Sequence, residues 1–159
     1  MLKKILVVED DSDLVELLRF NLKKEGYALA TASDGIEALK KAHSIRPDLI
    51  LLDLMLPELD GFAVCEILRR DPKTAAIPII ILTAMSSQLS RFNGLDAGAN
   101  VYLTKPFSHK YLRQVVRELL QRGLEVTHNR DRVANRNHEG GQDRIPATFS
   151  GETGESLAE

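Results

Sequence analysis

Cysteine is almost absent from this chain of 159 residues, in which Cys65 is the single example. No disulfide can therefore form within the chain, which is typical of a protein from a reducing compartment. No apolar run approaches the roughly 18 residues of a membrane-spanning helix, and the first apolar run is too short for a secretory signal. We therefore expect a cytoplasmic protein with no membrane partner.

A strong excess of positive charge is also lacking, because the formal net charge is −2. Proteins that bind nucleic acid or an anionic membrane usually carry a basic field. On this ground we expect no direct contact with nucleic acid. What the chain does contain is 43% hydrophobic residues, enough for one domain with a core.

Short apolar runs alternate with amphipathic segments along residues 1–123. The segments 49–54 and 77–82 lack polar alternation, which is typical of central parallel strands that are covered on both faces. We expect an α/β fold with a five-stranded parallel sheet, doubly wound, with helices on both faces. The candidate strands are 3–8, 27–32, 49–54, 77–82 and 101–104.

Helices are predicted between these strands from apolar residues that recur every three or four positions. Asp11 or Ser12 suits the start of the first helix, and Gly26 suits its end. The residues that mark the five helices are Leu14, Leu17, Leu18 and Leu22; Ile36, Leu39 and Ala42; Phe62, Cys65, Ile67 and Leu68; Leu89, Phe92, Leu95 and Ala99; and Leu112, Val115, Val116, Leu119 and Leu120.

The composition changes at residues 124–159. This tail is polar, with more acidic than basic residues and a few apolar residues that follow no period. Such a segment buries too little apolar surface to order itself, so we expect a disordered C-terminal tail. The alternative is a docking peptide or a partial extension of the last helix. The tail is too poor in apolar residues for a second domain.

Polar residues stand where the candidate strands end. Glu9 and Asp10 follow the first strand, and Asp53 lies in the third. The carboxyl ends of parallel strands meet at one edge of the sheet, where sites of such folds lie. Clustered carboxylates repel each other, and oxygen ligands without histidine or cysteine favour a hard cation, above all Mg²⁺. The alternative to a metal site is a structural role for Glu9 and Asp10, as an acid pair at a helix N-terminus.

Thr83 and Lys105 end the fourth and fifth strands, at the same expected edge. A carboxylate can act as the nucleophile that takes up a phosphoryl group. A lysine, a cation and a threonine hydroxyl can neutralise or hydrogen-bond the phosphoryl oxygens. The set of side chains therefore favours phosphoryl transfer.

Four motifs stand along the chain in a characteristic order and spacing: ILVVEDD, DLILLDLMLPELDGF, PIIILTA and YLTKPF. Through them, residues 2–122 resemble the receiver domain of two-component response regulators. The resemblance implies a flavodoxin-like (βα)5 fold with strand order 2-1-3-4-5. It also implies that residues 1–123 form the receiver domain.

The same resemblance assigns the site residues. Asp53 is implied to be the phosphoacceptor, and Mg²⁺ to be bound by Glu9, Asp10, Asp53 and the backbone carbonyl of Met55. Asp11 fits a helix start better than a ligand.

Four further residues have implied roles. Thr83 is the implied switch hydroxyl and Lys105 the implied lysine of the site, with a cis peptide bond between Lys105 and Pro106. Tyr102 is the implied switch aromatic, which turns inward when Thr83 moves toward the phosphoryl group; otherwise it is a half-buried strand aromatic.

The implied function is a signalling switch rather than an enzyme, one that catalyses only its own phosphorylation and slow autodephosphorylation. Its implied phosphodonor is a sensor histidine kinase or a phosphotransfer protein, and the surface of the fourth helix, fifth strand and fifth helix controls an unknown output protein. No helix-turn-helix pattern fits the tail, so we expect a stand-alone receiver.

The oligomeric state is left open between a monomer and a weak, phosphorylation-dependent dimer. Relatives with winged-helix domains tend to carry two acids at the positions of Asn100 and Val101, where they join a salt-bridged dimer face. Their absence argues against that dimer. Charged residues that still suit such pairing are Arg91, Asp96, Arg113 and Arg117.

Three rival classes fit the residues less well. A haloacid-dehalogenase-like phosphatase wants a second acid two residues after the nucleophile, where Met55 stands. A receiver-like scaffold that no longer uses phosphate usually lacks the acceptor, the lysine or the acid pair. A flavodoxin needs a Ser/Thr/Gly-rich loop after the first strand, where this chain has acids.

Overall fold

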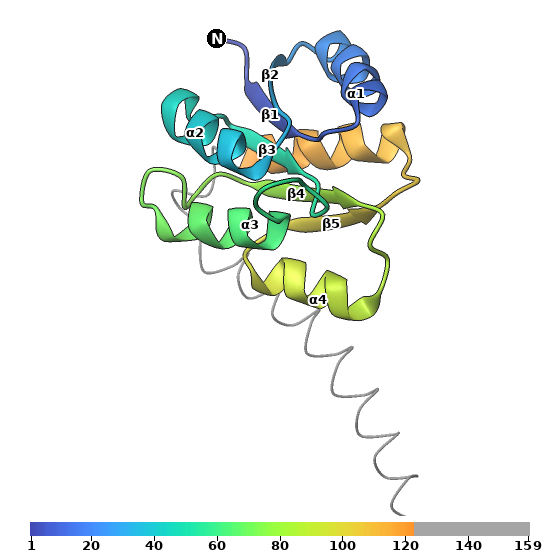
Figure 1. The fold of residues 1–159 in the computed structure, drawn as a ribbon. Coiled ribbons are helices and arrows are strands. Elements are labelled where there is room, and N and C mark those ends of the chain that lie inside the picture. The colour runs from blue at the N-terminus through green and yellow to red at the C-terminus, as the bar shows by residue number, and fades with distance from the viewer. Residues whose placement is uncertain (123–159) are drawn as a thin grey trace, which may run out of the picture. The chain divides into compact units, whose positions relative to one another are not determined.

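The computed structural model describes residues 1–122, and the predicted tail lies outside the described residues. Strands and helices alternate along the chain (Figure 1). The elements are β1 (Lys4–Val8), α1 (Ser12–Lys24), β2 (Ala28–Ala32), α2 (Gly35–Ile45), β3 (Leu49–Leu52), α3 (Gly61–Arg70), β4 (Ile79–Thr83), α4 (Gln88–Asp96) and β5 (Val101–Thr104). A fifth helix covers residues 109–122.

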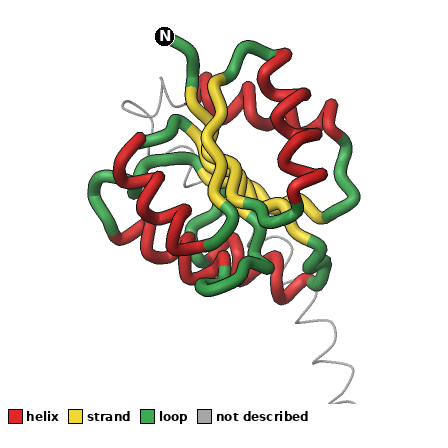
Figure 2. The backbone as a smooth tube through the Cα atoms, turned by 45° about the horizontal axis from the view of Figure 1, so that its top comes forward, coloured by secondary structure: helices red, strands yellow, loops and turns green. Residues whose placement is uncertain are grey.

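The five strands form one parallel sheet with the order β2-β1-β3-β4-β5. The sheet lies in the middle of the domain with helices on both sides (Figure 2). Every residue of β3 and β4 is buried, which explains why their sequences show no polar alternation. The predicted fold class and strand order are confirmed.

Each face of the sheet has its own hydrophobic core. On one face, Ala38 of α2 and Val64 of α3 pack with the side chains of Leu6 and Ile50. On the other face, Leu18 of α1 packs with residues of the helix over 109–122 against the sheet. The two cores hold the strands in register and thus fix the sheet edge at which the polar residues lie.

Aspartates cap the first three helices. Asp11 is the N-cap of α1, where its Oδ1 accepts from the Asp13 and Leu14 amides. Asp34 and Asp60 cap α2 and α3 in the same way. Such caps contribute about 1 kcal/mol each. Gly26 follows α1 with φ +93°, a conformation that favours glycine at a helix end.

Helix α4 differs from the expected pattern in which face is buried. Leu89, Phe92 and Leu95 are 69%, 49% and 43% exposed, whereas Gly94 is the buried residue of this helix. The apolar spacing thus predicts the helix but not the side that packs on the sheet. The reason is steric, because the ring of Tyr102 lies against the backbone of Gly94 and leaves no room there for a larger residue.

Within residues 1–122, none of the helices is both long enough and apolar enough to pass through a membrane.

Candidate functional site

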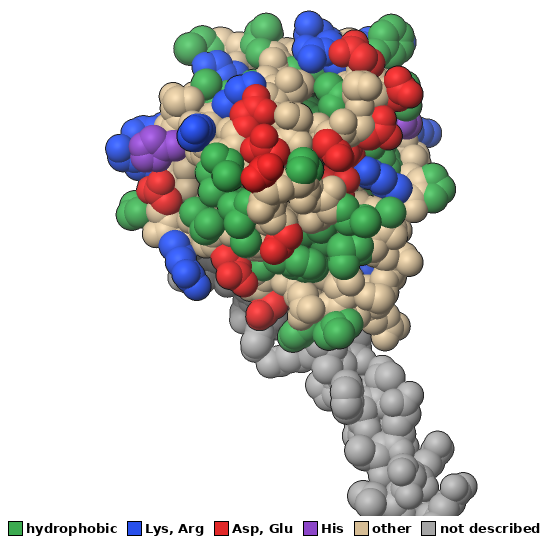
Figure 3. Space-filling view, viewed as in Figure 1, with side chains coloured by type: hydrophobic (Ala, Val, Ile, Leu, Met, Phe, Trp, Pro, Cys, Tyr) green, Lys and Arg blue, Asp and Glu red, His purple; other side chains and the backbone are tan. Residues whose placement is uncertain are grey.

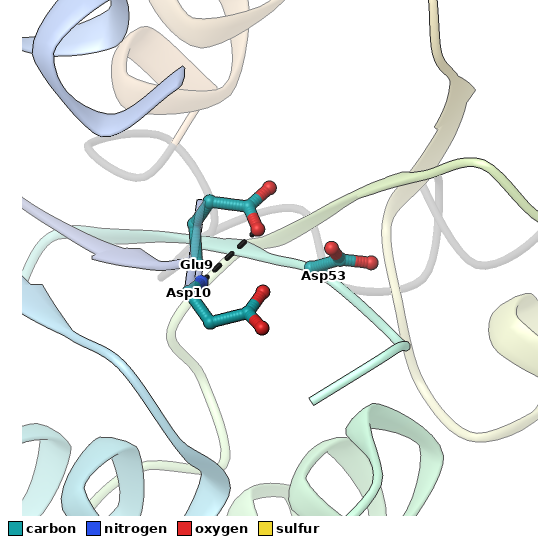
Figure 4. Close-up of side chains that lie close together, drawn as sticks. All are labelled: Glu9, Asp10 and Asp53. Atoms are coloured by element: carbon teal, nitrogen blue, oxygen red, sulfur yellow. Dashed lines mark hydrogen bonds between the residues drawn. The ribbon is translucent and has the colours of Figure 1, made fainter. Parts of the chain in front are cut away.

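Three carboxylates meet at the carboxyl ends of β1 and β3. One oxygen each of Glu9, Asp10 and Asp53 lies within 4.8 Å of the others (Figure 4). The pairing of β1 with β3 brings them together, since the Asp53 amide donates to the carbonyl of Val8 at 3.0 Å. Acidic side chains also gather near the middle of the face in Figure 3, next to hydrophobic side chains.

Glu9 is buried, and both of its carboxylate oxygens accept hydrogen bonds from other residues of the chain. Oε2 accepts from the amides of Asp10, at 3.0 Å, and Asp11, at 3.2 Å; the bond to Asp10 is the dashed line of Figure 4. Oε1 accepts from the Lys105 ammonium at 2.5 Å. Burial raises the pKa of Glu9 above its ordinary value, and the neighbouring Asp53 acts in the same direction, while Lys105 opposes both. The ionised carboxylate is therefore held in an environment that disfavours it.

Lys105 links the two strand ends through its side chain. Its ammonium donates to Oδ2 of Asp53 at 3.1 Å as well as to Glu9, and its own amide donates to the carbonyl of Thr83. The peptide bond between Lys105 and Pro106 is cis. Burial acts to lower the pKa of Lys105, but the hydrogen bonds to Glu9 and Asp53 outweigh it, so the pKa is raised. The lysine is thus a fixed positive charge among the carboxylates.

Asp53 is buried directly after β3, and its Oδ1 accepts from the Met55 amide at 3.1 Å. The side chain of Met55 is 60% exposed beside it. The following loop turns back on Asp53: a Cβ on Gly61 would lie 2.5 Å from the carbonyl oxygen of Asp53. Gly61 therefore permits a close approach that holds the backbone of Asp53.

Thr83 and Tyr102 are connected through Met85 in the loop between β4 and α4. Thr83 is fully buried at the end of β4, and its Oγ1 accepts from the Met85 amide at 3.3 Å. The hydroxyl of Tyr102 donates to the carbonyl of Met85 at 2.6 Å. Tyr102 is 3% exposed, so it is a buried rather than a half-buried strand residue.

The donor set fits a divalent hard cation. Three oxygen ligands converge without a histidine or cysteine among them, and the raised pKa of Glu9 reflects the unfavourable burial and crowding of negative charge. Mg²⁺ is bound in proteins by one or two carboxylates together with further oxygen atoms. The cluster therefore offers the ligand type that Mg²⁺ prefers.

Several contacts in the structure were not predicted from the sequence. Arg91 donates to the carbonyl of Tyr102 and lies over its ring, although the two residues are 11 positions apart. Arg113 and Arg117, which we considered for a dimer face, instead pair with Glu25 of the same chain at 3.4 and 3.3 Å. Nothing in the local sequence signals these contacts, because they join residues from different elements.

Comparison with known proteins identifies the family. Residues 5–117 match the model of the response regulator receiver domain. The chain is 49% identical, over 122 residues, to the alkaline phosphatase synthesis transcriptional regulatory protein PhoP of Bacillus subtilis; this alignment covers 77% of the chain and 50% of PhoP. It is 46% identical, over 119 residues, to the DNA-binding dual master transcriptional regulator RpaA of Synechocystis sp., covering 75% of the chain and 49% of RpaA.

A solved structure is also similar. The receiver domain of the sensor histidine kinase PA1611 from Pseudomonas aeruginosa PAO1 superimposes with a TM-score of 0.71 at 36% identity, covering 76% of this chain and 99% of that one. That structure has a magnesium ion coordinated in its active site cleft.

The relatives contradict one prediction. We expected no direct contact with nucleic acid, but RpaA is a DNA-binding regulator and PhoP a transcriptional regulatory protein. The prediction relied on the charge of these 159 residues, and the chain spans about half the length of the curated relatives it matches. The charge of residues that align with about half of each relative does not exclude DNA binding, so the prediction was wrong.

A family model over residues 5–117, close relatives and a superimposable receiver structure agree with the fold and with the cluster of acids at its strand ends. This chain belongs to the response regulator receiver domain family.

Proposed function

We propose that residues 1–123 form a phosphorylation-dependent switch of a two-component system, with Asp53 as the phosphoacceptor. The observation that carries the proposal is the position of Lys105, whose ammonium donates to both Glu9 and Asp53 within a cluster of three carboxylates. A buried nucleophilic carboxylate beside a fixed positive charge is suited to taking up an anionic phosphoryl group.

The cofactor we propose is Mg²⁺, held by the carboxylates of Glu9, Asp10 and Asp53 and by the backbone carbonyl of Met55. When bound, it would neutralise charge on the phosphoryl oxygens. The family resemblance supports this set, as do the three convergent carboxylates and the magnesium ion of the similar PA1611 receiver domain.

The donor we propose is the phosphohistidine of a sensor histidine kinase or a phosphotransfer protein. A carboxylate oxygen of Asp53 forms a bond to phosphorus while the phosphorus–nitrogen bond to the donor's imidazole breaks. The imidazole leaves as a neutral ring because its other nitrogen takes a proton from solvent. Lys105 faces the phosphoryl oxygens with its positive charge, and Thr83 donates its hydroxyl to one of them. The buried position of Asp53 limits the access of water to the reacting atoms.

The consequence we propose is a change at the surface formed by α4, β5 and the helix over 109–122. A hydrogen bond from Thr83 to the phosphoryl group alters the contact of Thr83 with Met85, and Met85 in turn holds the hydroxyl of Tyr102. A partner protein responds to the change when it binds one arrangement more tightly than the other. We retain the cytoplasm as the compartment of this switch, since Cys65 is the single cysteine of the sequence.

One finer prediction also stands as a proposal: a stand-alone receiver that acts on a partner protein. It is tested by capturing partners with the whole chain and with a version ending at Gly123, each with and without beryllofluoride. Relatives of about twice the aligned length weigh against it.

The proposal as a whole is tested by binding of beryllofluoride, which mimics a phosphoryl group on a carboxylate, measured by 19F NMR with Mg²⁺ present. The wild-type protein is expected to show a bound beryllofluoride resonance that disappears in Asp53→Asn and on removal of Mg²⁺. Equal binding by Asp53→Asn would assign the acceptor to another residue.

A further inference from the structure

Arg91 on α4 contacts Tyr102 of β5 in two ways. Its Nη1 donates to the carbonyl oxygen of Tyr102 at 3.0 Å, and its guanidinium lies over the ring, 5.1 Å from the ring centroid. A cation over a tyrosine face is attracted by the electrons of the ring. The two contacts hold the backbone and the ring of Tyr102 together, so they oppose rotation of the ring away from α4.

The inward side of the ring is fitted closely. The hydroxyl of Tyr102 donates to the carbonyl of Met85 at 2.6 Å. A Cβ on Gly94 would lie 2.8 Å from Cδ2 of Tyr102 and 2.9 Å from Cε2. Glycine is a poor residue for a helix interior, yet here only glycine leaves room for the ring. The structure thus shows an enclosed position for Tyr102, with Arg91 on its open side.

Met85 ties this position to the acceptor site. Its amide donates to Oγ1 of Thr83, and its carbonyl accepts from Tyr102. Any group that binds at Asp53 and draws on the hydroxyl of Thr83 therefore shifts the loop that also holds Tyr102. The receiver resemblance implies that the ring turns inward when Thr83 moves toward a phosphoryl group. Coupling of this kind is reciprocal, so whatever favours the inward tyrosine also favours binding at Asp53.

We propose that Arg91 is a positioning residue that holds Tyr102 inward and thereby raises the affinity of the Asp53 site for a phosphoryl group. The inference rests on the proposed function, because it concerns the same site. It assigns Arg91 a role within one chain. The other two arginines that we considered for a dimer face, Arg113 and Arg117, already pair with Glu25, the C-cap of α1.

The test compares Arg91→Met with the wild-type protein in two measurements. The first is the affinity for beryllofluoride with Mg²⁺ present. The second is the nuclear Overhauser effect between the Tyr102 ring and the Gly94 Hα protons, which requires the inward ring. Arg19→Met is the matched control, since it removes an arginine that pairs with Glu16 on α1. Arg91→Lys keeps the charge but loses the planar stack and the guanidinium donor geometry.

We expect Arg91→Met to weaken beryllofluoride binding about fivefold, because a smaller inward population lowers the apparent affinity in proportion. The Overhauser effect falls in parallel, Arg91→Lys is intermediate and Arg19→Met is unchanged. Unchanged binding in Arg91→Met overturns the proposal. So does a loss of affinity with the Overhauser effect intact, because Arg91 would then act by another route.

Failure of the proposed function has a different signature. In that case the wild-type protein does not bind beryllofluoride, or Asp53→Asn binds it equally. The Overhauser effect still reports whether Arg91 holds Tyr102 inward, and an unchanged effect in Arg91→Met overturns that part independently.

Discussion

The ammonium of Lys105 donates a hydrogen bond of 3.1 Å to Asp53, a residue 52 positions earlier in the chain. The same ammonium donates to Glu9, which is 96 positions earlier. One side chain from the end of β5 thus compensates buried acids at the ends of β1 and β3. The acids and their counter-charge come from three strands, so the site exists only when the sheet has formed.

Replacing Lys105 with Met removes this counter-charge. We expect Lys105→Met to lower the free energy of unfolding by about 1–3 kcal/mol, because two buried carboxylates lose a charged donor. Beryllofluoride binding is expected to be lost with it, as measured by 19F NMR. Lys110→Met removes an exposed lysine and is the control. Full beryllofluoride affinity in Lys105→Met would show that the lysine has no role at the acceptor.

Addition of Mg²⁺ should stabilise the protein. Burial disfavours the ionised Glu9 and neighbouring acids crowd it, so a cation that binds only the folded site relieves an unfavourable arrangement. At a Mg²⁺ concentration ten times the Kd, we expect a gain of about 1.4 kcal/mol in the free energy of unfolding. Thermal unfolding with and without Mg²⁺ measures it. Glu9→Gln should respond less, and an equal response would place the cation elsewhere.

Met55 is expected to slow hydrolysis of the phosphoryl group. It is bulky, largely exposed and adjacent to Asp53, so it hinders a water molecule that attacks in line. Met55→Asn should speed dephosphorylation by about three- to tenfold, a change of roughly 0.7–1.4 kcal/mol in the barrier. The decay of phosphorylated protein measures the rate. Leu17→Asn, at an exposed position of α1, is the control. An unchanged rate of dephosphorylation in Met55→Asn would contradict the prediction.

Gly61 is expected to be needed for the position of Asp53. A Cβ there would lie 2.5 Å from the Asp53 carbonyl oxygen and 2.6 Å from the Leu54 Cα, so the backbone must shift. We expect Gly61→Ala to lower the free energy of unfolding by about 1–3 kcal/mol and to slow phosphorylation.

Gly26→Ala is the matched control for that variant. No atom lies within 4 Å of a Cβ at Gly26, but its φ of +93° strains an alanine by about 1–2 kcal/mol. This variant should lose stability yet keep its rate of phosphorylation. Similar rates in both variants would mean that Gly61 only supports the fold.

The fold and the placement of the strand ends were predictable from the sequence. Wholly apolar strands such as Leu49–Leu52 indicate a sheet that is covered on both faces, and parallel strands bring their carboxyl ends to one edge. The prediction that Glu9 and Asp53 lie together needs no more than this. Strand β4 begins two residues later than expected, since Pro78 has no amide proton and Ile77 donates to Thr74.

Side-chain contacts between different helices and strands could not be predicted from the sequence. The spacing of Leu89, Phe92 and Leu95 predicts a helix, but the helix turns Gly94 to the sheet because the Tyr102 ring occupies that space. The stack of Arg91 on Tyr102 depends on the same packing. The prediction about nucleic acid failed for another reason, since a net charge describes only the residues that are counted.

The central claim is that Asp53 takes up a phosphoryl group. The most direct measurement is intact-mass spectrometry of the protein after incubation with acetyl phosphate and Mg²⁺, followed by peptide mapping. The account predicts one added phosphoryl group per chain, on the peptide that contains Asp53, and none in Asp53→Asn. Uptake by Asp53→Asn at the wild-type rate, or a phosphoryl group on another peptide, would contradict the account.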